Sequence, residues 1–304
     1  MARPDPALWC SNVHVRFPDG SHPVRGVSLR VYPGQVFALI GESGAGKTLL
    51  CRALYGLQRF IPGMEVMGTI GGAAEKAMIF QDPGQFLNPG LSIEGHFKEF
   101  LKLSPRPSLT MEQLLRYVGL PENREFSRKK PRLLSGGQQQ RVMIALSLAL
   151  EPKVLFADEA VTALDGLTRK TVIELLRQLC QDFGLGIIFV THDLHVADSL
   201  ADWVGVMYAG RIVELQSAEN LFTQPLHPYT KGLFRSHPGP EHRNSPLIEL
   251  PGRMPPPDHE DGGCPFFDRC PERMAVCKQH LPEMKELSRG VSVSCHRVFQ
   301  DRGY

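Results

Sequence analysis

The segment GESGAGKT, residues 41–48, has the residue types and spacing of a loop that binds phosphate. It follows an apolar, β-favouring run at Val36–Ile40 and leads into a segment of helical character. Glycines let backbone N–H groups surround an anion, and the helix N-terminus adds partial positive charge. Lys47 is expected to reach the outer phosphates and Thr48 to bind Mg²⁺. The strand before the loop and the helix after it argue against a chance match, so we predict a nucleoside triphosphate site. Its predicted residues are Gly41, Glu42, Ser43, Gly44, Ala45, Gly46, Lys47, Thr48 and Leu49.

A second phosphate-facing element follows about ninety residues later in LSGGQQQR, residues 134–141. Ser135, Gly136 and Gly137 precede an apolar segment, Val142–Leu150, that is expected to be helical. Free N–H groups beside a hydroxyl at a helix start favour anion binding.

Two adjacent carboxylates follow the apolar strand predicted at Val154–Ala157. Asp158 at a strand end suits a Mg²⁺ contact, and Glu159 suits a general base that polarises water. Acidic pairs at strand ends are often only turn residues or helix caps. The upstream phosphate loop makes the catalytic interpretation the stronger one.

Three further residues have weaker signals. Gln81 follows an apolar strand (77–80) and is either a Mg²⁺ or water contact or a turn residue. His192 follows a strand (186–190) and lies where ligands bind such sheets, although a lone histidine is more often structural. Phe17 is either a platform for an adenine ring or a core residue of an early strand.

The elements that must position these residues alternate between strands and helices. Two or three short strands are expected within residues 8–35, a helical stretch at about 86–134, a long helix from Thr168 to Cys180, and a hairpin at 203–214. This order predicts an α/β fold with a largely parallel core sheet. Past Phe222 we expect order to decline, because about half of the 25 prolines lie between Pro225 and Pro282.

Composition excludes several classes of protein. A net charge of +2 is too balanced for a nucleic-acid binder, and no stretch approaches the roughly 18 apolar residues of a membrane span. The start of the chain lacks the pattern of a secretory signal, so we expect a cytosolic chain unless a membrane partner holds it.

Four of the seven cysteines crowd the C-terminal region, separated by five, six and seventeen residues. A reducing cytosol favours a metal over disulfides. These spacings are wider than those of most zinc knuckles, so zinc, an iron–sulfur cluster and four free thiols all stay open. The candidate ligands are Cys264, Cys270, Cys277 and Cys295.

Together, GESGAGKT, Gln81, LSGGQQQR, VLFADE, the ALD that ends at Asp165, and THD closely resemble the ATPase subunit of an ABC transporter. IFQDPGQFLNP, HPYTKGLF and CPFFDRCPERMAVC are similar to the importer branch for oligopeptides, dipeptides and nickel. The resemblance implies a P-loop NTPase with a RecA-like core, a mainly parallel sheet, an N-terminal antiparallel β part and a helical insertion at about 86–135. It places the ATPase domain at 1–235 and a proline- and cysteine-rich extension at 236–304.

The resemblance also implies a mechanism in which two subunits pack head to tail around ATP and Mg²⁺. Each ATP is then held between the Lys47 loop of one chain and Ser135–Gly137 of the other, with Asp165 at the same interface. Glu159 activates water, His192 holds the γ-phosphate, and Gln81 senses Mg²⁺ and the membrane partner. Ala160 stands where the family usually has proline.

The implied partners are a second ATPase subunit, identical or paralogous, two transmembrane permease subunits and, indirectly, an extracytoplasmic solute-binding protein, with no nucleic acid. The implied location is the cytoplasmic face of the cell membrane, and the implied cargo is a peptide or a related small solute. The cysteine-rich extension is similar to extensions thought to hold a [4Fe–4S] cluster, with zinc as the alternative.

A soluble ABC ATPase with a non-transport role is the alternative function, but such a protein usually has two cassettes or a long coiled coil. A non-catalytic subunit would be expected to lack Lys47, Glu159 or His192.

Overall fold

The computed structural model describes residues 4–104, 108–162, 164–236, 250–259 and 262–300. The chain forms two compact units. Unit 1 is mainly Gly72–Phe189, with Val31–Val36 and the start of the chain up to Leu8. Unit 2 combines Trp9–Arg30, Phe37–Gly71 and the chain from Val190 onward. The predicted boundary at 235/236 stays a prediction, since residues 237–249 lie outside the described part.

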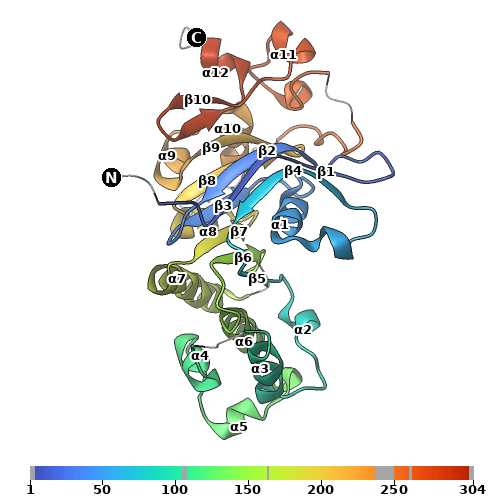
Figure 1. The fold of residues 1–304 in the computed structure, drawn as a ribbon. Helices are drawn as coiled ribbons and strands as arrows, with labels where there is room; N and C mark the ends of the chain where they lie inside the picture. Colours follow the sequence, from blue (N-terminus) through green and yellow to red (C-terminus); the bar gives the residue numbers. More distant parts are fainter. Residues whose placement is uncertain (1–3, 105–107, 163, 237–249, 260–261, 301–304) are drawn as a thin grey trace. The chain divides into compact units, whose positions relative to one another are not determined.

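Unit 1 contains three neighbouring strands in the order β7-β6-β5 and most of the helices coloured green in Figure 1. Strands β5 and β6 are parallel, with Ala77 opposite Leu155 and Ile79 opposite Ala157. The side chains of β6 are buried from Val154 to Ala157, as expected for a strand covered on both faces. The elements are β5 (Lys76–Ile79), α2 (Pro83–Phe86), α3 (Ile93–Leu101), α4 (Met111–Tyr117), α5 (Arg124–Ser127), η2 (Pro131–Leu133), α6 (Gly136–Leu148), β6 (Val154–Asp158), α7 (Gly166–Phe183) and β7 (Gly186–Val190).

Helix α6 is the centre of the helical part of unit 1. It contacts α2, α3, α4 and α7, and its residues from Val142 to Leu148 are all buried. Helix α7 buries only one face, whereas α6 is buried on all sides from Val142 onward. The buried residues of α7 recur at helical spacing, as in an amphipathic helix. The buried stripe of α7 consists of Val172, Leu175, Leu176, Leu179 and Cys180.

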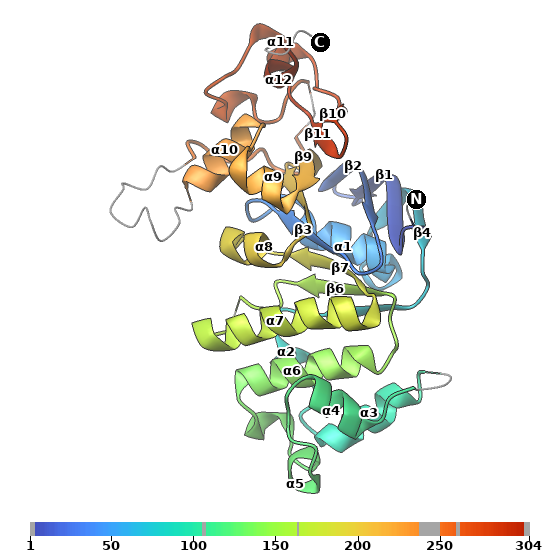
Figure 2. The ribbon, with the colours of Figure 1, turned by 90° about the vertical axis from the view of Figure 1, so that its left-hand side faces the viewer.

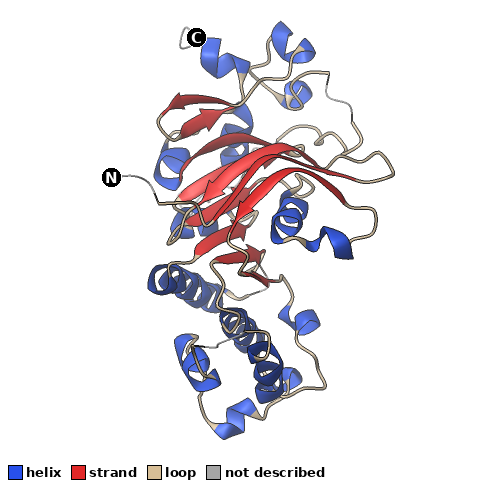
Figure 3. Ribbon diagram, in the orientation of Figure 1, coloured by secondary structure: helices blue, strands red, loops and turns tan. Residues whose placement is uncertain are grey.

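The described residues between β5 and α6 form helices and loops without strands, as the sequence predicts (Figure 3). The predicted capping box at Thr110 and Gln113 is confirmed at the start of α4. The prediction of a helix beginning at Val142 is corrected: α6 begins six residues earlier, at Gly136, because Ser135 and Gln138 form a second capping box.

Unit 2 contains five neighbouring strands in the order β10-β11-β9-β8-β3 and a separate three-stranded sheet, β2-β1-β4. Strand β3 is parallel to β8, with Ala38 opposite Val204, whereas β9 is antiparallel to β8. Helix α9 lies against β8 and β9 (Figure 2). The elements up to β9 are β1 (Leu8–Arg16), β2 (Val24–Val31), β3 (Val36–Ile40), α1 (Lys47–Tyr55), η1 (Leu57–Phe60), β4 (Glu65–Gly72), α8 (Leu194–Leu200), β8 (Trp203–Tyr208) and β9 (Arg211–Ser217).

The prediction that order declines past Phe222 is wrong for the described residues. Strand β11 pairs with β9 in antiparallel fashion, with Val293 opposite Glu214, and β10 pairs with β11. These pairings depend on residues distant in the sequence, which local composition does not report. The elements are α9 (Ala218–Thr223), α10 (Pro228–Arg235), η4 (Phe267–Arg269), α11 (Ala275–Gln279), β10 (Lys285–Ser288), β11 (Val291–Val293) and α12 (His296–Gln300).

The core of unit 2 joins the strand before the phosphate loop to the C-terminal segment, defined here as the described residues from 250 to 300. Ile40 of β3, Tyr208 of β8, Tyr229 of α10 and Phe266 belong to one buried cluster. The ring centroids of Tyr208 and Tyr229 are 4.5 Å apart, and those of Tyr208 and Phe266 are 5.3 Å apart. The C-terminal segment is therefore folded onto the strand that presents the phosphate loop.

Within the described ranges, none of the helices combines the length and apolarity needed to cross a bilayer.

Candidate functional site

The phosphate loop of unit 2 connects β3 to α1 and depends on two glycines. Gly41 has φ of 146° and Gly46 has φ of 101°, both in the region that side chains disfavour. A Cβ on Gly41 would lie 2.2 Å from the carbonyl oxygen of Met207, and one on Gly46 would lie 2.2 Å from that of Pro23. Backbone from two other segments thus packs directly against the loop, and only glycine fits at either position.

Lys47 is the first residue of α1, and its side chain is held inside the loop. Its Nζ donates hydrogen bonds to the carbonyl oxygens of Gly41 at 2.8 Å and Glu42 at 2.9 Å, and the residue is 6% exposed. The ammonium group therefore lies at the N-terminus of α1, where its charge adds to that of the helix dipole. Thr48, the predicted Mg²⁺ ligand, is half-buried beside it.

Two residues that the sequence analysis did not assign to the site anchor this loop. The backbone N–H of Glu42 donates to the Tyr229 hydroxyl at 2.9 Å. The Glu42 carboxylate accepts from Nη1 of Arg269, at 3.1 Å and 3.2 Å to its two oxygens. Tyr229 lies in the HPYTKGLF motif, which indicated the family but did not predict the contact with Glu42. Arg269 had no local signal.

The HPYTKGLF motif is fixed by a buried polar network. Glu214 of β9 accepts hydrogen bonds from the N–H groups of Leu226 at 2.8 Å and His227 at 2.9 Å. Nδ1 of His227 accepts from the N–H of Tyr229 at 3.0 Å and so caps α10. Burial raises the pKa of Glu214 and lowers the pKa of His227 to about 3. The network therefore holds a neutral histidine that orients the start of α10.

His192 and Phe17 are the other predicted site residues of unit 2. Thr191, next to His192, donates its N–H to the carbonyl of Leu39 at 3.2 Å, so this turn lies beside the end of the strand that leads into the phosphate loop. His192 itself is exposed. Phe17 is half-buried in the turn after β1, where its N–H donates to the carbonyl of Ser21 at 3.0 Å, so it is not a core residue of the strand.

The carboxylate pair lies in unit 1. Asp158 is the last residue of β6 and Glu159 follows it; both are half-buried. Glu159 has φ of 50°, a left-handed conformation that is uncommon outside glycine and is concentrated at functional sites. The N–H of Thr162 donates to the Glu159 carbonyl at 3.2 Å, which closes a turn. The tight turn fixes the direction in which the Glu159 side chain leaves the strand.

Gln81 lies at the same end of the unit 1 strands as Asp158 and Glu159. Because β5 and β6 are parallel and Ile79 lies opposite Ala157, Asp158 at the end of β6 and Gln81, two residues after β5, lie at the carboxyl ends of adjacent strands. Gln81 is exposed, and the neighbouring Asp82 caps α2 by accepting from the N–H of Gly84. The arrangement brings an amide and two carboxylates to one edge of unit 1.

Ser135 and Asp165 have structural roles that the sequence analysis did not give them. The Ser135 hydroxyl accepts from the N–H of Gln138 at 3.3 Å, and the Ser135 N–H donates to the Gln138 side chain at 3.1 Å. Asp165 caps α7 by accepting from the N–H and hydroxyl of Thr168, and these hydrogen bonds lower its pKa. Gly136 and Gly137 begin α6, whose first N–H groups have no acceptor within the helix.

The four C-terminal cysteines line a single cavity together with Phe266. The N–H of Cys264 donates to the carbonyl of Cys277 at 2.7 Å, which brings the two ends of this loop together. Burial and the neighbouring thiols raise the pKa of Cys264 to about 12, and burial raises that of Cys270 to about 11. In the described part of the chain, no three His, Cys, Asp or Glu side chains are arranged as ligands of a metal ion. The structure gathers the four thiols at one cavity, and the prediction that they bind an iron–sulfur cluster or zinc stays a prediction.

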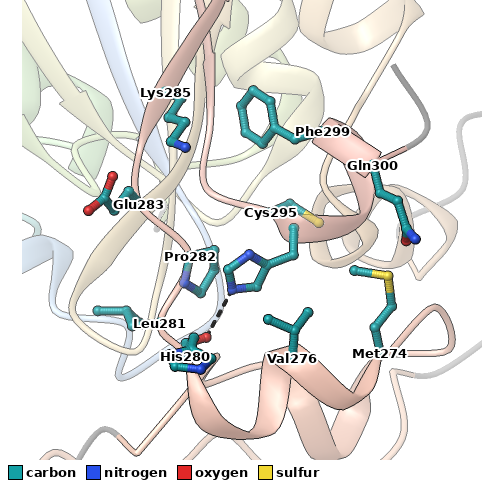
Figure 4. Close-up of a pocket in the computed structure, with 11 residues that line it drawn as sticks. Met274, Val276, His280, Leu281, Pro282, Glu283, Lys285, Cys295, Phe299 and Gln300 are labelled. Atoms are coloured by element: carbon teal, nitrogen blue, oxygen red, sulfur yellow. Dashed lines mark hydrogen bonds between the residues drawn. The ribbon is translucent and has the colours of Figure 1, made fainter. Parts of the chain in front are cut away.

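A separate, open cavity of about 630 Å³ lies at the end of the C-terminal segment (Figure 4). Val276 of α11, Lys285 of β10 and Phe299 of α12 line it, and Nε2 of His296 is 3.0 Å from the carbonyl oxygen of His280. Cys295 lines both this cavity and the cavity of the four cysteines.

Comparison with known proteins shows which family the chain resembles. The family described as "ABC transporter" matches residues 24–162, and that described as "Oligopeptide/dipeptide transporter, C-terminal region" matches residues 213–277. The chain is 36% identical over 304 residues to the oligopeptide transport ATP-binding protein AppD of Bacillus subtilis (strain 168), with 92% of each chain covered. It is 33% identical over 326 residues to OppD of Escherichia coli (strain K12), covering 98% of this chain and 95% of that protein.

Among solved structures, the chain resembles cbiO1 of Clostridium perfringens, part of the ABC transporter complex cbiONQ. The TM-score is 0.60 at 24% identity, over 73% of this chain and 92% of that one, which shows a shared fold. From the two matched regions and the near full-length relatives, the chain belongs to the ABC transporter family, as an ATPase subunit of its oligopeptide/dipeptide branch.

Proposed function

We propose that this subunit hydrolyses ATP to power an importer that carries peptides, or a related small solute such as a nickel chelate, across the cytoplasmic membrane. The observation that carries the proposal is the match of residues 213–277 to the C-terminal region of oligopeptide/dipeptide transporters, on a chain that also contains a phosphate loop. The relatives named above are peptide transport ATP-binding proteins along nearly their whole length. The subunit acts peripherally, at the cytoplasmic face of the membrane.

Within one subunit, the residues divide the work of hydrolysis. The phosphate loop and Lys47 bind the outer phosphates, and Thr48, Gln81 and Asp158 supply oxygen ligands for Mg²⁺. Glu159 accepts a proton from the attacking water, and its fixed turn supports that role. His192 contacts the γ-phosphate, a role supported by the bond that ties its turn to β3.

Hydrolysis needs a second ATPase subunit, identical or paralogous. Ser135 and Gly136 are exposed at the start of α6, where the first N–H groups of a helix have no acceptor within it, and this suits contact with a nucleotide on another chain. Asp165 stands at the same interface. Closure of the two ATPase subunits around ATP drives a conformational change in two permease subunits. An extracytoplasmic solute-binding protein delivers the cargo to the permeases.

The experiment is affinity purification of the intact complex, identification of its subunits, and reconstitution in lipid vesicles with the solute-binding protein. We expect ATP hydrolysis to increase when a transported solute is added, and a panel of dipeptides, longer peptides and nickel chelates identifies it. A subunit that co-purifies with no membrane protein and hydrolyses ATP at a rate that permeases do not change would instead have a non-transport role.

We further propose that Cys264, Cys270, Cys277 and Cys295 hold a [4Fe–4S] cluster, with zinc as the alternative. The donor chemistry fits, since four thiols line one cavity and soft thiolates are the usual ligands of both. Gly263 supports the close approach of the loops, because a Cβ there would lie 2.5 Å from the carbonyl oxygens of Cys277 and Lys278. A bound metal would cross-link a segment whose apolar core is small.

Metal content tests this second proposal without reference to ATPase activity. Anaerobically purified protein should be brown and contain iron and sulfide, and the Cys270→Ser variant should lose both. Cys180→Ser is the matched control, because Cys180 lies on α7 and its thiol donates to the carbonyl of Leu185 at 3.2 Å, a bond that serine can keep. A colourless protein with one equivalent of zinc supports the zinc alternative, and a protein with neither metal contradicts the proposal.

A further inference from the structure

Three parts of the chain beyond α9 converge on the phosphate loop within unit 2. The Tyr229 hydroxyl accepts from the Glu42 N–H, and Nη1 of Arg269 lies 3.1 Å and 3.2 Å from the two Glu42 carboxylate oxygens. The Met254 methyl group would be 3.3 Å from a Cβ placed on Gly44. The loop is therefore held from the C-terminal side by a hydrogen bond and an ion pair, and the Met254 methyl group limits the space beside Gly44.

The ion pair is anchored on the Arg269 side. The Arg269 side chain is 5% exposed, whereas that of Glu42 is 30% exposed. Nε of Arg269 donates to the Pro251 carbonyl at 2.8 Å, and its guanidinium carbon lies 5.7 Å from the Tyr208 ring centroid and 5.9 Å from that of Phe266. A guanidinium held in this way presents its charge to Glu42 in one fixed orientation.

The charge of the loop explains what this pair can do. Residues 41–48 carry one carboxylate, Glu42, and one ammonium, Lys47. A carboxylate next to a polyphosphate is repulsive, and burial strengthens that repulsion because less water screens it. A fixed guanidinium beside Glu42 cancels its charge and leaves the Lys47 charge to act on the phosphates.

We propose that Arg269 is a positioning residue for ATP, which neutralises Glu42 so that the phosphate loop can accept a triphosphate. The C-terminal segment thereby sets the affinity of the loop for nucleotide, although it supplies no atom to the reaction. The inference rests on the proposed role of the phosphate loop in binding ATP. The proposed role depends on the charge of residue 42. A role in which Arg269 only holds the C-terminal segment in place would not depend on that charge.

The test compares Arg269→Gln, Glu42→Gln and the double variant in the full-length chain. The dissociation constant of a non-hydrolysable Mg–ATP analogue is measured by calorimetry, and KM and kcat by steady-state hydrolysis. We expect Arg269→Gln to weaken binding by about tenfold or more, equivalent to about 1.4 kcal/mol, with kcat at saturating ATP near the wild-type value. Glu42→Gln should bind as well as wild type or better, and the double variant should recover to the affinity of Glu42→Gln.

Two controls keep the outcomes separate. Arg273→Gln removes an arginine of the same segment that lies over Phe267 at 5.6 Å, and should bind ATP as wild type does. Arg269→Lys keeps the charge and should keep most of the affinity, which preserves the test if Arg269→Gln does not fold.

The proposal is overturned if Arg269→Gln binds normally, if the double variant is as weak as Arg269→Gln, or if Glu42→Gln alone weakens binding tenfold. Lys47→Ala separates this inference from the proposed site. If Lys47→Ala binds ATP normally, the assignment of the phosphate loop fails. If Lys47→Ala loses binding while Arg269→Gln does not, only the role of Arg269 fails.

Discussion

The Tyr229 hydroxyl accepts a 2.9 Å hydrogen bond from the backbone N–H of Glu42, although the two residues are 187 positions apart. Tyr229 is fully buried, and burial raises the pKa of its hydroxyl, so the group stays protonated. One N–H of the phosphate loop is thus used to fix the loop to α10 rather than to contact an anion.

Tyr229→Phe removes the acceptor and leaves the Glu42 N–H without its partner. We expect a loss of about 1–3 kcal/mol in the free energy of unfolding and a higher KM for ATP, because a loosened loop must be ordered on binding. Urea unfolding and steady-state hydrolysis measure the two effects. Tyr117→Phe, an exposed tyrosine of α4, is the control and should change neither. An unchanged KM would show that the anchor serves stability alone.

Lys47→Ala should abolish ATP hydrolysis by weakening phosphate binding. The ammonium group is held by two loop carbonyls in the described chain, so its removal should also leave the loop less ordered. Nucleotide binding by calorimetry, together with phosphate release, measures the loss. Lys102→Ala is the control, since Lys102 pairs with Glu99 on the exposed side of the chain. Wild-type binding by Lys47→Ala would remove this residue from the site.

Glu159→Gln should keep ATP bound while stopping hydrolysis, because an amide cannot accept the proton from water. The variant should therefore stabilise an ATP-bound dimer, which size-exclusion chromatography with ATP detects. Glu174→Gln on the exposed face of α7, where Glu174 lies 3.9 Å from Lys170, should behave as wild type. Hydrolysis at the wild-type rate by Glu159→Gln contradicts its assignment as the base.

Ser135→Ala separates a helix cap from a nucleotide contact. Thr110 and Ser135 both begin helices with complete capping boxes, so Thr110→Ala is a matched control for the loss of a cap. Each substitution should lower stability by about 1 kcal/mol. Only Ser135→Ala should also lower ATP hydrolysis, and the wild-type rate per subunit should rise with protein concentration. Equal activity of the two variants would leave Ser135 as a cap only.

His227 should make unfolding sensitive to pH. Burial lowers its pKa from 6.5 to about 3, so below pH 6.5 the unfolded chain takes up a proton that the folded chain does not. The free energy of unfolding should therefore fall as the pH decreases from about 6.5 towards 3, by about 1.4 kcal/mol per pH unit. Urea unfolding at several pH values measures this slope.

His227→Asn should be less stable at pH 7.5 but should lose this part of the slope. His195→Asn, at an exposed position of α8, should keep it. A slope that is the same in wild type and His227→Asn would mean that other groups cause it.

The parts of the molecule that could be predicted from the sequence are those with local signals. The phosphate loop between a strand and a helix, the strand that ends at Asp158 and the long stripe of α7 depend on residues close in the sequence. The start of α6 was also encoded locally, by Ser135 and Gln138, but low apolar content at residues 136–141 hid it.

The order of the C-terminal segment could not be predicted in this way. Arg269 pairs with Glu42, which lies 227 positions away in the sequence. Strand β11 pairs with β9, although α9 and α10 lie between them in the sequence. No window of sequence reports such pairs, and the prolines around them indicate a linker when taken alone. The same reason explains why Tyr229 was associated with a family signature and not with the phosphate loop.

The pairing of β11 with β9 has a consequence for any shortened form of the subunit. Strand β9 has β8 on one side and β11 on the other, so its backbone groups are satisfied only while the C-terminal segment is present. Removal of residues 285–304 would turn β9 into an exposed edge, which can pair with the edge of another molecule. Such a form should aggregate even with its phosphate loop intact.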